Sequence, residues 1–479
     1  MSSRTSVKYL ALLVGPIIFL LIQIVNPQIW FPEIAWDVFS IGIWMIIWWV
    51  FEAIPIFATA LLPMILFPST GVFKLAEATS PYASPIIFLF MGGFMLALAM
   101  EKHKLHKRIA LNLIHLTGTN ANGIILGFML ATAVLSMWIS NTATTVMMLP
   151  IALSVVKLLE KHNDSFSGFG RFKTALFLSI AYSANVGGMA TIIGTPPNVV
   201  LVGLVQNILG ETIDFVNWLI IGIPTVTVMI IVIYQLLTKV LFKHGIKKIE
   251  GAESYIHKEI ASLGQWSQEE KWVAIIFGIT AICWIGKSQI NSLIGSEILN
   301  DTVTAMSGGL ATFLIPLNKS GKMLMKWEDM KNLPWGILIL FGGGMALAKA
   351  MEEAGFVDMI GQAIGSYKDI PIWLLILVLT ALSLFLTEIM SNVALTTIAI
   401  PMVLSISSGL EVNPYLLAIP VAMATSCAFM MPISTPPNAI VFSSGYINIK
   451  QMVRAGIILN LFAIIILVLA GIFLAPYIN

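Results

Sequence analysis

The chain has 479 residues, of which 58% are hydrophobic and 10% are charged, and its formal net charge is +2. Its mean hydropathy is +0.92. Because soluble domains carry about 25% charged residues, these values exclude a water-soluble globular protein. Apolar runs recur throughout the chain, for example at 10–25 and 459–475, and runs of this length indicate membrane-spanning helices. We therefore predict an all-α polytopic membrane protein.

The expected spans divide into an N-terminal helix and two halves. Region 1–36 holds a first helix at 9–25, which we expect to be retained because no small-residue cleavage site follows it. A first half, 37–243, has expected spans at 37–51, 54–70, 84–101, 174–207 and 214–242. The polar segment 244–269 is expected to be an amphipathic linker at the cytoplasmic interface. A second half, 270–479, has expected spans at 270–287, 302–317, 334–352, 413–445 and 452–477.

Two further apolar segments, 121–157 and 372–408, are interrupted by SNTATTVMMLP (140–150) and SNVALTTIAIP (391–401). If both segments crossed the bilayer, positive charges would fall on both sides. As re-entrant hairpins they leave about eleven spans and put most Lys and Arg on one face, as the positive-inside rule requires. The N-terminus is then cytoplasmic and the C-terminus outside. The outer face keeps only Lys74, Lys287 and Lys368, and its loops hold Glu211, Asp214, Asp358, Asp369 and Glu411.

The two interruptions belong to an internal repeat. They are separated by 251 positions, and the same offset aligns FMGGFMLALAME (90–101) with FGGGMALAKAME (341–352), which agree at eight positions of twelve. A third pair, GTPPNVVLV (194–202) and STPPNAIVF (434–442), follows at an offset of 240. An odd number of spans separates the matched elements, so the halves have opposite orientations. Inverted repeats are typical of secondary transporters with a substrate site near the midplane.

The Thr-Pro-Pro-Asn segments predict broken helices at 174–207 and 413–445, because two prolines cannot lie inside a regular helix. Irregular backbone at membrane depth is tolerated only where it is buried in protein or lines a wet cavity. A break is expected to expose carbonyls on one side and N–H groups on the other. Helix N-termini with Ser, Asn and Thr side chains bind anions, and unwound carbonyls bind small cations. Such motifs also serve as contacts between packed helices, but two motifs paired with two breaks favour a site.

Neither interruption contains Lys, Arg or His. A dianion at the midplane would therefore need cations to compensate its charge. Glu388, directly before the second interruption, is a functional candidate because it is an intramembrane acid. A structural role is the favoured alternative, since the first half has Met137 at the equivalent position. The sequence shows no phosphate loop, metal cluster or nucleophile–base pair, and we expect neither an enzyme nor a nucleic-acid partner nor an organic cofactor.

These motifs, in this order and spacing, resemble the divalent anion/sodium symporters, which carry dicarboxylates, citrate or sulfate, and the resemblance covers essentially the whole chain. It implies an elevator-type transporter, a homodimer in the cell membrane, with Na⁺ as the co-transported ion. The family pattern has Ser-Asn-Thr at both tips, whereas the second tip here has Val393. The substrate residues implied by the resemblance are Ser140, Asn141, Thr142, Thr195, Pro196, Ser391, Asn392, Val393, Thr435 and Pro436.

The resemblance also implies two sodium sites. The first would consist of Ser136, Ser140, Asn141 and Gly194, and the second of Thr387, Met390, Asn392 and Ser434. The function that follows is sodium-coupled symport of C4-dicarboxylates such as succinate, malate and fumarate. A dicarboxylate exchanger, a citrate or sulfate carrier, and a proton-coupled carrier using Glu388 stay open as alternatives. A channel is disfavoured, because two hairpins entering from opposite sides suit alternating access.

Overall fold

The computed structural model describes residues 2–25, 33–118, 120–163, 168–246, 252–317, 322–356, 359 and 370–478. Within these ranges the regular elements are helices joined by turns and irregular segments, and one isolated bridge pairs Pro316 with Met323. The predicted all-α class is therefore confirmed. Asp358, Lys368 and Asp369, which were expected on the outer face, lie outside the described residues.

The N-terminal helix is α1 (Ser2–Val25), and the next helices are α2 (Glu33–Phe51), α3 (Ile56–Thr59), α4 (Leu62–Thr70), α5 (Leu75–Thr79), the 3₁₀ turn η1 (Ser80–Ala83) and α6 (Pro85–Lys102). They continue with α7 (Leu105–Leu116), α8 (Ala121–Ser136), α9 (Asn141–Asn163), α10 (Phe169–Gly188), α11 (Pro196–Leu209), α12 (Phe215–Gln235) and the π-helical η2 (Leu236–Leu241).

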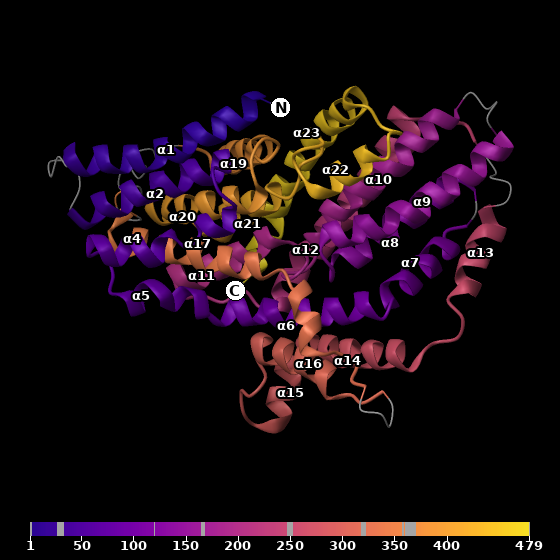
Figure 1. Cartoon of the computed structure of the whole chain (residues 1–479), viewed down its shortest axis with the longest axis horizontal. Helices are drawn as coiled ribbons and strands as arrows, with labels where there is room; N and C mark the ends of the chain where they lie inside the picture. The colour runs from indigo at the N-terminus through magenta and orange to yellow at the C-terminus, as the bar shows by residue number, and fades with distance from the viewer. Residues whose placement is uncertain are drawn as a thin grey trace.

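The expected linker holds α13 (Ala252–Ser262), and the second half follows with α14 (Gln268–Ile285), α15 (Lys287–Ile294), α16 (Asp301–Leu314), η3 (Trp327–Asn332) and α17 (Trp335–Glu353). It ends with α19 (Ile372–Leu386), α20 (Asn392–Gly409), α21 (Tyr415–Ala424), α22 (Pro436–Ser443), α23 (Ile449–Phe473) and η4 (Ala475–Tyr477). In Figure 1, α14, α15 and α16 project from one long side of the molecule, while α1 and α23 lie toward the opposite side.

Seven helices in the described ranges are long and apolar enough to cross a membrane, and α14 with α15, bent by 78°, could form an eighth span. Other expected spans are built from shorter apolar helices. The segment 54–70 becomes α3 and α4, and the expected span 302–317 ends as a helix at Leu314. The chain is therefore a multi-pass membrane protein in which several crossings are interrupted.

The matched glycines of the repeat let helices approach closely. A Cβ on Gly92 of α6 would lie 2.4 Å from the Ala305 carbonyl carbon in α16, and a Cβ on Gly343 of α17 would lie 2.2 Å from the Ala60 oxygen. No larger residue fits at either position without moving backbone. The two glycines hold α6 against α16 and α17 against the α3 region.

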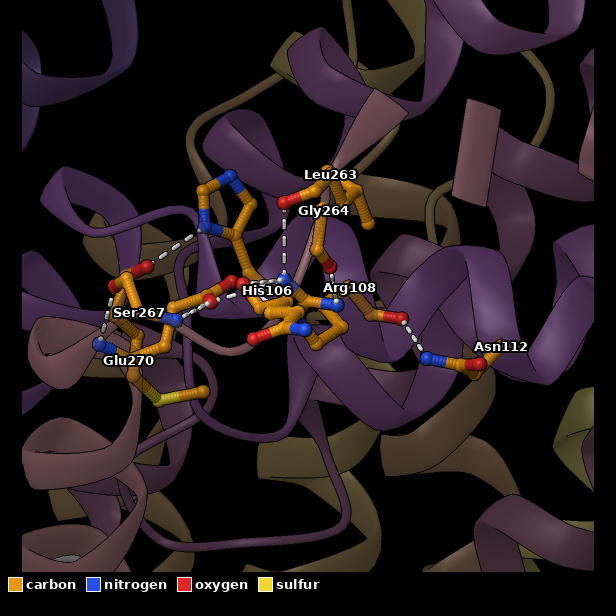
Figure 2. Close-up of polar contacts among 9 residues, drawn as sticks. His106, Arg108, Asn112, Leu263, Gly264, Ser267 and Glu270 are labelled. Atoms are coloured by element: carbon orange, nitrogen blue, oxygen red, sulfur yellow. Dashed lines mark hydrogen bonds and ion pairs between the residues drawn. The ribbon is translucent and has the colours of Figure 1, made fainter. Parts of the chain in front are cut away.

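A buried ion pair fixes the segment that joins the two halves, as Figure 2 shows. Arg108 of α7 and Glu270 of α14 are 6% and 5% exposed. Arg108 Nε donates to Glu270 Oε1 at 2.9 Å, and Nη2 donates to Oε2 at 3.0 Å. Arg108 also donates to the Gly264 carbonyl at 3.1 Å and to the Leu263 carbonyl at 3.2 Å. These hydrogen bonds of the Arg108 guanidinium group attach α7 to the turn that precedes α14.

We expect Arg108→Ala to lower the free energy of unfolding by about 3–5 kcal/mol, because it leaves a buried Glu270 carboxylate without its cation. The matched control is Lys107→Ala, which removes a half-exposed ion pair with Glu259 at 3.2 Å; such pairs contribute about 0–1 kcal/mol. Thermal unfolding of both variants in detergent measures the difference. Equal melting temperatures for the two variants would contradict the structural role of the Arg108–Glu270 ion pair.

Candidate functional site: a cavity between two hairpin tips and two broken helices

Each hairpin turns through a tip that starts a new helix. α8 ends at Ser136 and α9 begins at Asn141, while α19 ends at Leu386 and α20 begins at Asn392. Ser140 Oγ accepts a hydrogen bond from the Ala143 N–H at 3.2 Å, which caps the start of α9. The Ser-Asn pair of each motif therefore sits at a helix N-terminus, where N–H groups and the positive helix end are available.

The prolines of each Thr-Pro-Pro-Asn motif start a helix rather than interrupt one. Pro196 is the first residue of α11 and Pro436 the first of α22, and the irregular segments 189–195 and 425–435 precede them. Proline suits the first turn because the missing N–H would have no partner there. The expectation of free N–H groups on the helix side of each break is wrong for the first two positions, because both are proline. α11 and α22 instead present the hydroxyls of Thr195 and Thr435.

The asparagine of each motif satisfies carbonyls that its own break leaves open. Asn198 Nδ2 donates to the Thr191 carbonyl at 2.8 Å. In the second half, Asn438 Nδ2 donates to the carbonyls of Ala428 at 3.0 Å and Met431 at 3.1 Å. Both asparagines are completely buried. They hold the irregular segments in shape, as backbone at membrane depth requires.

The starts of α9, α11, α20 and α22 line one cavity of about 770 Å³. The structure thereby brings together every residue that the resemblance assigned to the substrate: Ser140, Asn141, Thr142, Thr195, Pro196, Ser391, Asn392, Val393, Thr435 and Pro436. Of the residues assigned to sodium, Gly194, Met390 and Ser434 also line this cavity. Ser136 and Thr387 are buried, each bonded to the asparagine of its tip.

Behind the first tip, the hydroxyl of Ser136 faces two acceptor oxygens but has only one proton to donate. Ser136 Oγ lies 2.6 Å from Asn141 Oδ1 and 2.7 Å from the Ala184 carbonyl oxygen. A serine hydroxyl has one proton to donate, so it satisfies one of these acceptors at a time. Buried oxygens without a full set of donors are unfavourable alone and suit a small, hard cation.

The second tip repeats this arrangement. Thr387 Oγ1 lies 2.7 Å from Asn392 Oδ1 and 2.7 Å from the Thr425 carbonyl oxygen. Thr396 Oγ1 lies 2.7 Å from Thr425 Oγ1, which adds hydroxyl groups to the same cluster. A hydroxyl therefore stands between the tip asparagine and a carbonyl of the broken helix in both halves. The arrangement provides two oxygen clusters, one on each side of the cavity.

The cavity has almost no charged lining. Among the described residues that line it, Lys8 and Glu52 are the charged ones. Their side chains form an ion pair at 3.4 Å and are 47% and 58% exposed, so they mark the open mouth of the cavity. Between the tips the donors are hydroxyls, amides and helix N-termini. Such a site favours an anion without neutralising it.

Comparison with known proteins places the chain in a family. The family model described as "Sodium:sulfate symporter transmembrane region" matches residues 4–477. The chain belongs to the sodium:sulfate symporter family. It is 41% identical over 476 residues to the "Sodium-dependent dicarboxylate transporter SdcS" of Staphylococcus saprophyticus, with 98% of this chain and 92% of that protein covered.

Other relatives agree with this assignment. The protein of the same name from Staphylococcus aureus strain RF122 is 39% identical, with 98% of this chain and 91% of the relative covered. Among solved structures, the YdaH transporter of Alcanivorax borkumensis has a TM-score of 0.59 at 14% identity, covering 86% of this chain and 88% of that one. MtrF of Neisseria gonorrhoeae has a TM-score of 0.56 at 10% identity, covering 86% and 83%. At these identities the two structures show a shared fold alone.

The sequence did not single out two asparagines that this family member places around the site. Asn185 lines the cavity, and its Nδ2 lies 3.2 Å from both the Ala428 carbonyl and Thr435 Oγ1, which joins α10 to the second break. Asn460 of α23 donates to Glu388 at 3.0 Å. Each is an amide with apolar neighbours on its helix, and that polarity was the available signal.

We expect Asn141→Ala and Asn392→Ala each to raise the half-saturating sodium concentration by roughly tenfold, the effect of losing about 1.4 kcal/mol of binding free energy. Each change removes the amide oxygen that a buried hydroxyl faces. The measurement is the sodium-dependent rise in melting temperature of the purified protein, with choline as the reference cation. Asn112→Ala is the matched control, because Asn112 bonds the Arg108 carbonyl on α7. An unchanged sodium response in either tip variant would remove that asparagine from the cation site.

Proposed function

We propose that this protein is a secondary active transporter that couples the entry of sodium to the uptake of C4-dicarboxylates such as succinate, malate and fumarate. The observation that carries the proposal is the pair of oxygen clusters around Ser136 and Thr387, which flank one cavity lined by four helix N-termini. The clusters suit two sodium ions, while the N-termini of α9 and α20 and the hydroxyls of Thr195 and Thr435 suit carboxylates.

The charges of the cavity support coupled transport. A dianion at membrane depth is unfavourable without compensating charge, and the described lining residues include no basic side chain besides Lys8 at the mouth. Sodium ions at the two clusters would supply the missing positive charge. Each sodium would also hold a tip asparagine in place, Asn141 on one side and Asn392 on the other, so cation binding would assemble the anion site.

The names of the relatives support the choice of substrate, since two staphylococcal proteins of this family are called sodium-dependent dicarboxylate transporters. By their position in the cavity, Asn141, Thr142, Asn392 and the two break threonines would hold the carboxylates. Val393 replaces the threonine of the family pattern, and the second carboxylate would then rely on Asn392 and Thr435. Sulfate or citrate on the same scaffold is the second candidate, because the family description names sulfate.

Alternating access by an elevator motion is the mechanism that we propose, in a homodimer in the cell membrane with a cytoplasmic N-terminus. The hairpins and broken helices would move together as the transport domain, because α11 packs on α20 and α22 packs on α9 and α10. With Lys8 on the cytoplasmic face by the positive-inside rule, the mouth of the cavity would face the cytoplasm. The structure would then represent the inward-facing state.

The test is uptake of labelled succinate into proteoliposomes under an inward sodium gradient, an inward proton gradient, or succinate loaded inside without either gradient. We expect concentrative uptake with sodium alone. Uptake that ignores sodium but responds to internal dicarboxylate would make the protein an exchanger. Uptake driven by protons would overturn the sodium assignment, and competition by unlabelled sulfate or citrate stronger than by malate would change the substrate.

A further inference from the structure

Glu388 lies in the turn between α19 and α20, directly behind the second tip, and is 3% exposed. Its Oε1 accepts hydrogen bonds from the Phe429 N–H at 2.8 Å, the Met430 N–H at 2.9 Å and Asn460 Nδ2 at 3.0 Å. Three donors thus converge on one carboxylate oxygen. Two of them are backbone groups of the irregular segment 425–435, so the carboxylate organises this break.

The other oxygen, Oε2, accepts from the Met431 N–H at 3.3 Å and from Ser434 Oγ at 2.7 Å. Four of the five partners are N–H groups, which can only donate, and this set of donors fits the ionised carboxylate. None of the ion pairs found in the described part of the chain involves Glu388. Hydrogen bonds therefore stabilise a negative charge that no ion pair among the described residues neutralises.

In the first half, the corresponding N–H groups of the break have acceptors other than an acidic side chain. The residue at the equivalent position of its tip is Met137. There the N–H groups of Met189 and Ala190 donate to backbone carbonyls, at 3.0 and 3.1 Å, while their equivalents Phe429 and Met430 donate to Glu388. α10 continues to Gly188, whereas α21 ends at Ala424. The carboxylate thus replaces carbonyl acceptors and lengthens the second break.

Glu388 also determines how Ser434 faces the cavity. Ser434 Oγ lies 2.7 Å from Glu388 Oε2 and 2.9 Å from the Glu388 carbonyl oxygen, and Ser434 lines the cavity. Because the hydroxyl proton is donated to Glu388, the lone pairs of Ser434 Oγ stay available to a cation. The first half has Gly194 at this position, so the two expected sodium sites differ in their ligands, and the second lies beside a carboxylate.

We propose that Glu388 is the positioning residue of the second cation site, and that its fixed negative charge makes this site bind sodium more tightly than the first. The proposal rests on the proposed function and deepens it by making the two sodium sites inequivalent. Glu388 acts through Ser434 and the 429–431 backbone rather than as a direct ligand. A sodium ion at the second site would offset the carboxylate charge, which otherwise opposes an approaching dianion.

The experiment measures equilibrium binding of radioactive sodium to the purified protein, and separately sodium-driven succinate uptake, for wild type and Glu388→Gln. Glutamine keeps the shape and one acceptor oxygen but removes the charge. We expect the half-saturating sodium concentration of the tighter phase to rise by roughly tenfold or more, as for the loss of a charged hydrogen-bond partner. Maximal uptake at saturating sodium should be retained, a split that a general folding defect would not produce.

Glu101→Gln, the same change near the end of α6 and away from the cavity, is the matched control. Sodium binding by Glu388→Gln that equals wild type would overturn the inference while the proposed function stands. If wild type binds sodium more tightly than Glu388→Gln but takes up no succinate, the proposed substrate is overturned and the inference stays intact. Absence of sodium binding by wild type would overturn both.

If Glu388→Gln does not fold, Asn460→Ala tests the same point, because it removes one donor to Oε1 and leaves the charge in place. We expect a smaller shift in the same direction, about threefold in half-saturating sodium, the size of a weak hydrogen bond. Binding identical to wild type in a folded Asn460→Ala protein would contradict the positioning role.

Discussion

A helix that ends inside a bilayer leaves carbonyl and N–H groups that no water can satisfy, and this constraint governs the architecture around the cavity. The chain satisfies the carbonyls with one buried asparagine in each half, Asn198 and Asn438. In the second half it satisfies three N–H groups with the Glu388 carboxylate. The hydroxyls of Ser136 and Thr387 each face the amide oxygen of a tip asparagine and a backbone carbonyl. In each half a single hydroxyl proton therefore faces two acceptor oxygens, and such oxygen clusters suit small cations.

The packing of the two halves against each other explains how both contribute to one cavity. α11, which follows the first break, packs against α20 of the second hairpin, and α22, which follows the second break, packs against α9 of the first hairpin. Each half therefore contributes one side of the cavity and supports the other. Asn185 of α10 adds a direct contact between the halves, because its Nδ2 donates to Thr435 Oγ1 at the second break at 3.2 Å. Under the proposed function, this exchange would couple the two cation sites to the anion site.

The sequence predicted the helical membrane class, and the resemblance named the residues that the structure gathers in the cavity, because the repeat and the Ser-Asn and Thr-Pro-Pro-Asn motifs are local signals. Contacts between distant segments were not predictable in the same way. The partners of Glu388 lie on the 429–434 segment and on α23, and no local pattern connects them to the second tip. Helix ends were also less predictable: 54–70 reads as one apolar run, but Pro55 and Pro63 stand at the starts of two short helices. The ion pair between Arg108 and Glu270 depends on tertiary packing that composition does not encode.

The measurement that tests the central claim most directly is the equilibrium dissociation constant of succinate for the purified protein as sodium replaces choline at constant ionic strength. If sodium at the two oxygen clusters assembles the anion site, linkage requires the succinate affinity to rise with sodium concentration. The logarithmic slope should approach about two at low sodium, one for each cluster. A succinate dissociation constant that does not change with sodium would contradict the account, because the clusters around Ser136 and Thr387 would then have no part in forming the site.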